Sequence, residues 1–220
     1  GASITDGDNN LVVGYNALSS SVSAQSNTAI GTASMQNTTT AHTNVAIGGE
    51  TMGGITTATV QDATAVGYAA FKGSSSTTTG ANGTTAIGRK ALFALTTGDK
   101  NIAIGYEAQL SQTTGSRNTV IGHGAMRTAD GGEDFNTIIG SEAGYYINND
   151  ASHDNIIIGV NALQGGTGTI LGNIAIGTRA MDAVSNNSQT GTVAIGTDAL
   201  GALTSGGENM AIGYQAMGSI

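Results

Sequence analysis

The stretch NIAIGYEAQL, residues 101–110, is one copy of a phrase that recurs along the whole chain. Related copies read NTAIGTASM, NVAIGGETM, NTVIGHGAM, NIIIGVNAL, NIAIGTRAM and NMAIGYQAM. Aligned on their glycine, the copies follow one another every 17 to 21 residues, with a mean of about 18. A fixed period of this kind indicates a repeat architecture, in which each unit packs against its neighbours. The repeat glycines are Gly14, Gly31, Gly48, Gly67, Gly88, Gly105, Gly122, Gly140, Gly159, Gly177, Gly196 and Gly213.

An apolar pair precedes every repeat glycine. The residue directly before it is Ile or Val, and the residue before that is usually Ala. Because adjacent strand residues point to opposite faces, two consecutive apolar residues predict a strand that is covered on both faces. The consensus N-x-A-I-G-x-x-A-L, followed by a polar link, therefore predicts a strand, a glycine bend, a second short strand and a loop.

Composition favours strands over helices. A glycine in a helix interior costs about 1 kcal/mol relative to alanine, and the β-branched runs and Thr-rich links add to that penalty. Helical solenoid repeats are also longer, at about 33 residues or more. We therefore expect an all-β fold, a parallel β-solenoid (β-roll) of about twelve coils of ~18 residues, as one repetitive domain over residues 1–220 of a longer fibrous protein.

An asparagine opens most of the repeats, at Asn10, Asn27, Asn44, Asn101, Asn118, Asn136, Asn155, Asn173 and Asn209. Asn suits a turn, because its side chain bonds the local backbone and tolerates left-handed geometry. Stacked copies could also form an amide ladder. Ala63, Thr84 and Thr192 interrupt the series.

Charge and composition exclude several classes of protein. The formal net charge is -8 with only 7 Lys and Arg, which argues against nucleic acid as a partner. Cysteine is absent, so thiolate metal sites and cysteine nucleophiles are excluded. No apolar run approaches the length of a membrane span, and we expect no membrane insertion. No motif predicts a cofactor, a catalytic residue or an enzyme.

A coil of about 18 residues has room for one internal core, yet the apolar pair faces two ways. The second apolar row needs a cover, and association of identical chains supplies one. The sequence does not decide which of the two rows faces the chain's own core.

The units NTAIG, NVAIG, NIAIGYEA and NMAIGYQAM, each followed by a GxxA pattern, resemble the shaft of bacteriophage tail fibres, where NTAIGYxAL repeats alternate with TTG-containing links such as LTTGDKN (95–101). They are also similar to the head of trimeric autotransporter adhesins, a left-handed parallel β-roll with a tighter repeat. The longer, uneven links favour the phage fibre.

The resemblance implies a rigid homotrimeric shaft in the virion tail fibre that supports attachment to a host cell-surface glycan or protein, and it implies no catalytic residues. An adhesin head at the bacterial cell surface and a polysaccharide-degrading tail spike are the alternatives. A spike would need paired carboxylates, and Asp99, Glu107, Asp182, Asp198 and Glu208 mark no pair in the sequence.

The least regular repeat carries the candidate recognition residues Tyr145, Tyr146, Asn148, Asn149 and Asp150. Aromatic rings beside amides and a carboxylate form a plausible sugar platform. Packing of the two tyrosines at an oligomer seam or in the core explains the same residues, and we favour that reading.

Two acidic links invite a calcium hypothesis. ADGGEDFN (129–136) contains Asp130, Glu133 and Asp134, and NNDASHDN (148–155) contains Asp150 and Asp154. Neither has the spacing of a known calcium loop, so we predict solvated surface loops and no metal site. The histidines His42, His123 and His153 lie in different repeats, and we predict solvated loop residues for these as well. In a trimer, three copies of His123 could bind an ion on the axis.

Overall fold

The computed structural model describes residues 7–56, 59–73 and 80–218, and in these ranges the regular structure is strand, with no helix. The chain forms two compact units, Gly1–Glu107 and Ala108–Ile220. Each unit is a parallel β-solenoid, and the two contain about 11 turns that are about 18 residues apart. The predicted all-β solenoid is confirmed.

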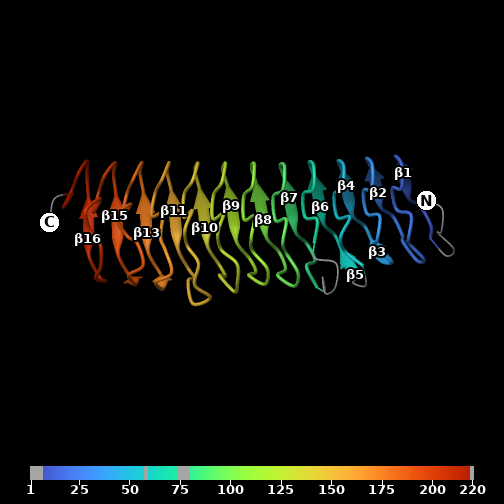
Figure 1. Ribbon diagram of the computed structural model, residues 1–220. Coiled ribbons are helices and arrows are strands. Elements are labelled where there is room, and N and C mark those ends of the chain that lie inside the picture. The colour runs from blue at the N-terminus through green and yellow to red at the C-terminus, as the bar shows by residue number, and fades with distance from the viewer. Residues whose placement is uncertain (1–6, 57–58, 74–79, 219–220) are drawn as a thin grey trace. The chain divides into compact units, whose positions relative to one another are not determined.

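One three-residue strand per coil precedes each repeat glycine, and these strands stack in parallel and in chain order within each unit (Figure 1). In the first unit they are β1 (Leu11–Val13), β2 (Thr28–Ile30), β4 (Val45–Ile47), β6 (Thr64–Val66), β7 (Thr85–Ile87) and β8 (Ile102–Ile104). In the second they are β9 (Thr119–Ile121), β10 (Thr137–Ile139), β11 (Ile156–Ile158), β13 (Ile174–Ile176), β15 (Val193–Ile195) and β16 (Met210–Ile212).

The register places equivalent residues on one another, so that each strand position forms a row. Ala29 of β2 pairs with Ala46 of β4, which pairs with Ala65 of β6, and all three side chains are fully buried. The residues on either side of them, such as Thr28 and Ile30, are partly exposed. The structure thus assigns the small middle row to the chain's own core and turns the Ile/Val row outward.

The predicted second strand directly after the glycine is wrong. That segment is a series of turns in which every second residue has a left-handed backbone, as at Ala33 (φ 57°) and Met35 (φ 50°). Its backbone still bonds to the next coil, because the Met35 N–H donates to the Thr51 carbonyl at 2.8 Å. The left-handed turn points Met35 into the core, where it is fully buried. Stacking between coils overrides the ordinary cost of this conformation for a large side chain.

Second strands form instead in a few links, just before the next repeat begins. β3 (Thr40–His42) pairs with β5 (Thr59–Gln61), and β12 (Ile170–Leu171) pairs with β14 (Gln189–Thr190). Two further links contribute an isolated bridge, Gln25 to His42 and His153 to Leu171, and in the remaining described links the backbone runs as turns and bends.

The repeat glycines are required by backbone shape and by space. Gly67 has a φ of +127°, and a Cβ atom there would lie 2.7 Å from the carbonyl oxygen of Gly88. Real Cβ atoms do not approach that closely, so only glycine allows successive coils to stack at this bend. The same close approach recurs along the row, as at Gly48, where a Cβ would lie 2.6 Å from the carbonyl oxygen of Gly67.

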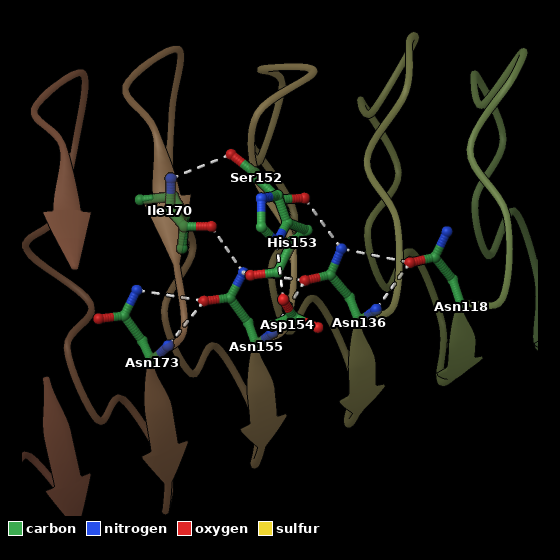
Figure 2. A network of polar contacts seen from close by, with 8 residues as sticks. All are labelled: Asn118, Asn136, Ser152, His153, Asp154, Asn155, Ile170 and Asn173. Carbon is green, nitrogen blue, oxygen red and sulfur yellow. Dashed lines mark hydrogen bonds and ion pairs between the residues drawn. The ribbon is translucent and has the colours of Figure 1, made fainter. Parts of the chain in front are cut away.

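The asparagines form the predicted amide ladder. In the first unit, the backbone N–H and Nδ2 of Asn27 both donate to Oδ1 of Asn10, at 3.0 Å each. Figure 2 shows the same arrangement in the second unit for Asn118, Asn136, Asn155 and Asn173. The left-handed residue is not the asparagine but the one before it, such as Ser26 (φ 56°).

Candidate recognition and metal-binding surfaces

The two tyrosines of the irregular repeat differ in burial, although their rings are in contact. Their rings meet edge to face, with centroids 4.6 Å apart. Tyr145 is half-buried beneath Arg127, whose Nη1 donates to the Tyr145 hydroxyl at 3.1 Å. Tyr146 is 51% exposed, which excludes a core position for its ring in the single chain. An exposed ring at Tyr146 fits an oligomer seam and a sugar platform alike.

The other predicted recognition residues divide between two surfaces. Tyr146 and Asn148 line a groove of about 380 Å³ together with Thr128, Thr167, Ser185 and Asn186. Asn149 bonds backbone groups of two links, because its Nδ2 donates to the Thr167 carbonyl of the next link at 2.9 Å and its Oδ1 accepts the Ala151 N–H of its own link at 3.0 Å. Asp150 lies on a different surface, where its Oδ1 accepts the Gly132 N–H at 3.2 Å. The five residues therefore do not form one site.

Asp150 belongs instead to an acidic group made by two consecutive links. Carboxylate oxygens of Asp130, Glu133 and Asp150 all lie within 4.8 Å of one another. Asp130 and Asp150 are exposed, whereas Glu133 is fully buried. The sequence placed Asp130 and Glu133 in one link and Asp150 in the next, and the stacking of links one repeat apart brings them together.

Burial dominates the electrostatics of Glu133. Loss of solvent raises the pKa of its carboxyl above the ordinary glutamate value, and hydrogen bonds from the Gly131 N–H and Gln112 Nε2 oppose that rise. The negative charge of Asp150 raises the pKa further. No sequence signal marked this glutamate as buried, because the charged residues of polar links usually face solvent.

The three histidines lie in different coils, and one of them, His153, lines a cavity of about 310 Å³ together with Asp150 of the acidic group. His42 is part of β3 and half-buried, and His123 is exposed directly after Gly122. His153 contacts Asp154, with Nδ1 and Oδ2 2.8 Å apart, on an exposed part of the link.

A second groove holds two carboxylates near the end of the chain. Asp182 and Asp198 line a cavity of about 550 Å³ with Gln215 and Met217. Burial raises the pKa of the Asp182 carboxyl, and the nearby Arg179 opposes this. Asp198 is held by Arg179 through two bonds, Nε to Oδ1 at 2.7 Å and Nη2 to Oδ2 at 3.0 Å. The ion pair occupies both oxygens of Asp198, which makes this carboxylate a poor nucleophile or base.

The sequence did not decide which apolar row faces away from the chain's own core. In each unit, the first and third residues of every strand lie on that side of the strand stack, and we call this surface the outer face. Third-position residues such as Ile47, Ile87 and Val13 are 38%, 37% and 52% exposed, and Ile156 at a first position is 40% exposed. Isolated apolar side chains are normal on a surface, but a continuous apolar row indicates an interaction site.

Three consecutive coils of the first unit carry a large aromatic or charged side chain directly after the repeat glycine, at Tyr68, Arg89 and Tyr106. The Arg89 guanidinium lies 6.0 Å from the ring centre of Tyr68 and 5.4 Å from that of Tyr106. Tyr68 donates its hydroxyl to Glu50 at 2.9 Å, and Lys72 Nζ lies 2.7 Å from the same carboxylate. These contacts join side chains of successive coils in the first unit.

The chain matches no protein-family model, no curated protein and no solved structure in comparisons with known proteins. In the described ranges of the chain, no helix has the length and apolar character needed to cross a bilayer. The functional conclusion therefore depends on the surfaces described above.

Proposed function

We propose that the chain is a shaft segment of a phage tail fibre, in which three identical chains pack their outer faces together and form a rigid support for host attachment. The observation that carries this proposal is the apolar outer face. A row of half-exposed Ile and Val residues runs along the strand stack of each unit, on the side opposite the buried alanine row.

The geometry favours a copy of the same chain as the cover. The row repeats with the same spacing as the coils, so a partner of matching length needs the same periodicity, and an identical chain has it. Three chains around one axis cover three such faces without leaving an edge. The repeats NTAIGYxAL and their TTG links, which resemble phage fibre shafts, favour the same assembly.

Stiffness follows from the stacked contacts within each unit. Glycine bends, asparagine side chains and backbone bonds all join one coil to the next, so that no coil can move without breaking bonds on both sides. A segment with such contacts would serve as a spacer. The proposal assigns it no reaction, and its partners are its own copies and, through the fibre, a host-surface glycan or protein.

The first test is the mass in solution, measured by light scattering coupled to size exclusion. We expect about 65 kDa, three times the 21.7 kDa chain. Replacing Ile47 and Ile87 with lysine should yield folded single chains, because three inward lysines per row would be buried without counter-charges. Gln25→Lys, on an exposed link residue, is the matched control and should remain trimeric. A wild-type mass of one chain would refute the proposal.

The alternatives make different predictions. An adhesin head is also trimeric, and a coiled-coil stalk with a membrane anchor in the flanking sequence would favour it. A tail spike would release reducing sugars from capsule or lipopolysaccharide, and the groove lined by Asp182 and Asp198 offers one pair of carboxylates for that chemistry. If the wild-type chain released sugars and Asp182→Asn abolished the release, a polysaccharide-degrading enzyme would be the correct function in place of a shaft without catalytic activity.

A further inference from the structure

The acidic group formed by Asp130, Glu133 and Asp150 contains an unusual carboxylate. Glu133 is fully buried, although its link is polar and exposed at both ends. Its Oε2 accepts the Gly131 N–H and Nε2 of Gln112, both at 3.2 Å. Its Oε1 is buried and has no hydrogen-bond partner. Leaving a buried polar atom unpaired is unfavourable, and more so on a charged group, so an unpaired Oε1 needs an explanation.

The residues around Glu133 further destabilise its negative charge when no counter-ion is bound. Its nearest acidic neighbours, Asp130 and Asp150, bring further negative charge within 4.8 Å. No Lys or Arg ion pair found in the described chain involves any of the three residues. Like charges at this distance repel, and burial of one of them increases the repulsion. A bound cation would stabilise this arrangement, in which two exposed carboxylates lie beside a buried carboxylate that has one oxygen without a hydrogen-bond partner.

We propose that Asp130, Glu133 and Asp150 bind a calcium ion. The donors are oxygens alone, with no nitrogen or sulfur, which selects hard cations. Calcium takes 6–8 oxygens at about 2.3–2.6 Å, so ligands on opposite sides of the ion are about 4.6–5.2 Å apart. The observed separations of up to 4.8 Å fit this sphere. Three carboxylates supply up to six oxygens, and water completes the shell.

The site has a defined structural consequence, because its ligands come from consecutive links. Asp130 and Glu133 belong to the link before β10, and Asp150 to the link before β11. The Gly132 N–H already bonds Asp150 across the two links. A bound ion would fasten the links to each other more strongly, so calcium should stabilise the second unit. This inference does not depend on the oligomer or on attachment to a host.

The test uses the full chain, stripped of metal with a chelator. Isothermal titration with CaCl₂ should show one ion per chain, with a Kd of about 10⁻⁵–10⁻³ M. Saturating calcium should raise Tm by about 5 °C or more, and magnesium should raise it less. Glu133→Gln and Asp150→Asn should each weaken binding at least about tenfold. Asp154→Asn is the control: it removes one charge from the same link, at a residue that contacts His153 rather than the acidic group, and should leave Kd unchanged.

Three outcomes would overturn the calcium assignment. The first is the absence of saturable binding up to about 10 mM, beyond the weak end of protein calcium sites. The second is wild-type affinity in Asp150→Asn, which decides the matter even if Glu133→Gln fails to fold, because Asp150 is exposed. The third is tighter binding of magnesium than of calcium. A trimeric mass with no calcium binding would refute this inference alone, and binding by a single chain would refute only the trimer.

Discussion

Oδ1 of Asn136 accepts two hydrogen bonds from Asn155, one from its backbone N–H at 3.2 Å and one from Nδ2 at 2.9 Å. Asn136 in turn donates its Nδ2 to Oδ1 of Asn118 at 3.2 Å and to the Ser152 carbonyl at 3.1 Å. Every hydrogen-bonding group of the Asn136 amide is thus used inside a fully buried row (Figure 2). Asn136, Asn155 and Asn173 each bond both the coil before them and the coil after them.

Removing the side chain of one asparagine in the row should leave hydrogen-bonding groups in the neighbouring coils without a partner. In Asn136→Ala, the Asn155 N–H and amide lose their acceptor, and the Ser152 carbonyl loses a donor. Because these groups are buried, we expect a loss of about 2–4 kcal/mol in the free energy of unfolding, measured by guanidinium denaturation. Asn136→Asp should be no better, since a carboxylate oxygen would then face Oδ1 of Asn118.

Asn148→Ala is the matched control for this prediction. Asn148 is a half-buried link asparagine, and the same side-chain truncation there should cost less than about 0.5 kcal/mol. Equal losses at positions 136 and 148 would show that the ladder adds nothing beyond the usual effect of truncating an asparagine.

The glycine row gives a second prediction, because lack of space and a strongly positive φ act together at Gly67, whereas Gly83 has room for a Cβ and a milder φ. Gly67→Ala places a Cβ 2.7 Å from the Gly88 carbonyl oxygen, whereas Gly83→Ala meets only Cγ of Lys100 at 3.6 Å. Both positions have positive φ, at +127° and +62°. We expect Gly83→Ala to cost about 1–2 kcal/mol and Gly67→Ala at least about 3 kcal/mol in the same denaturation experiment. Similar costs would mean that the coils can separate to admit a methyl group.

These two rows were also the part of the fold that the sequence predicts best. A glycine and an asparagine at a constant place in each repeat have direct physical causes, a positive φ and a stackable amide. The left-handed turns at Met35 and Leu200 (φ 50° and 52°) were not predictable in the same way. Single-residue preferences oppose that conformation for large side chains, and only the stacking of one coil on the next compensates for it.

The candidate sites likewise contain features that the sequence predicts and features that it does not. Asp130 and Asp150 could be expected to meet once the links were known to stack, because they lie about one repeat apart in the sequence. The burial of Glu133 depends on Gln112 and Gly131 packing over it, and no pattern in the sequence marks that contact. Tyr145 and Tyr146 are neighbours in the chain, yet the turn sends them to different surroundings.

A third prediction concerns the titration of Glu50. Its hydrogen bond from Lys72, and then that from Tyr68, holds the pKa of the Glu50 carboxyl below the ordinary value of 4.5. A lowered pKa contributes stability that is present above the unfolded-state pKa and is lost as the pH falls through the folded-state pKa. Because the pair is more than one third exposed on the Glu50 side, the contribution should stay below about 1 kcal/mol.

Lys72→Met should raise the pKa of Glu50 toward the ordinary value and reduce the loss of stability below about pH 4.5. A carboxyl-detected NMR titration measures the first effect directly. Lys100→Met removes an equally charged residue that contacts Asp99 at 3.4 Å, away from Glu50, and should leave its titration unchanged. A Glu50 pKa that is the same in both variants would contradict the proposed cause.

The last prediction concerns the irregular repeat at and after β10. There, one core position that is usually large holds a small residue, and another that is usually small holds a large one. Gly144 occupies the place at which other coils carry a large apolar residue, such as Met126 or Leu163, and it keeps their left-handed backbone (φ +60°). A Cβ at Gly144 would lie 3.0 Å from Cδ1 of Ile138 and 3.1 Å from Cδ1 of Ile147. Ile138, at a strand position that is usually alanine, thus fills the space that the missing side chain leaves.

The exchange predicts strong coupling in a double-mutant cycle. Gly144→Met should overpack the coil and cost about 1–3 kcal/mol, and Ile138→Ala should leave a cavity and cost about 2–5 kcal/mol. The double variant restores the alanine and methionine of a regular coil, so its cost should fall below either single value, with a coupling energy above about 2 kcal/mol. Ile157→Ala combined with Gly144→Met is the control, because Ile157 belongs to the next strand, whose coil already carries Leu163. Additive losses at positions 138 and 144 would mean that the two side chains do not share one space.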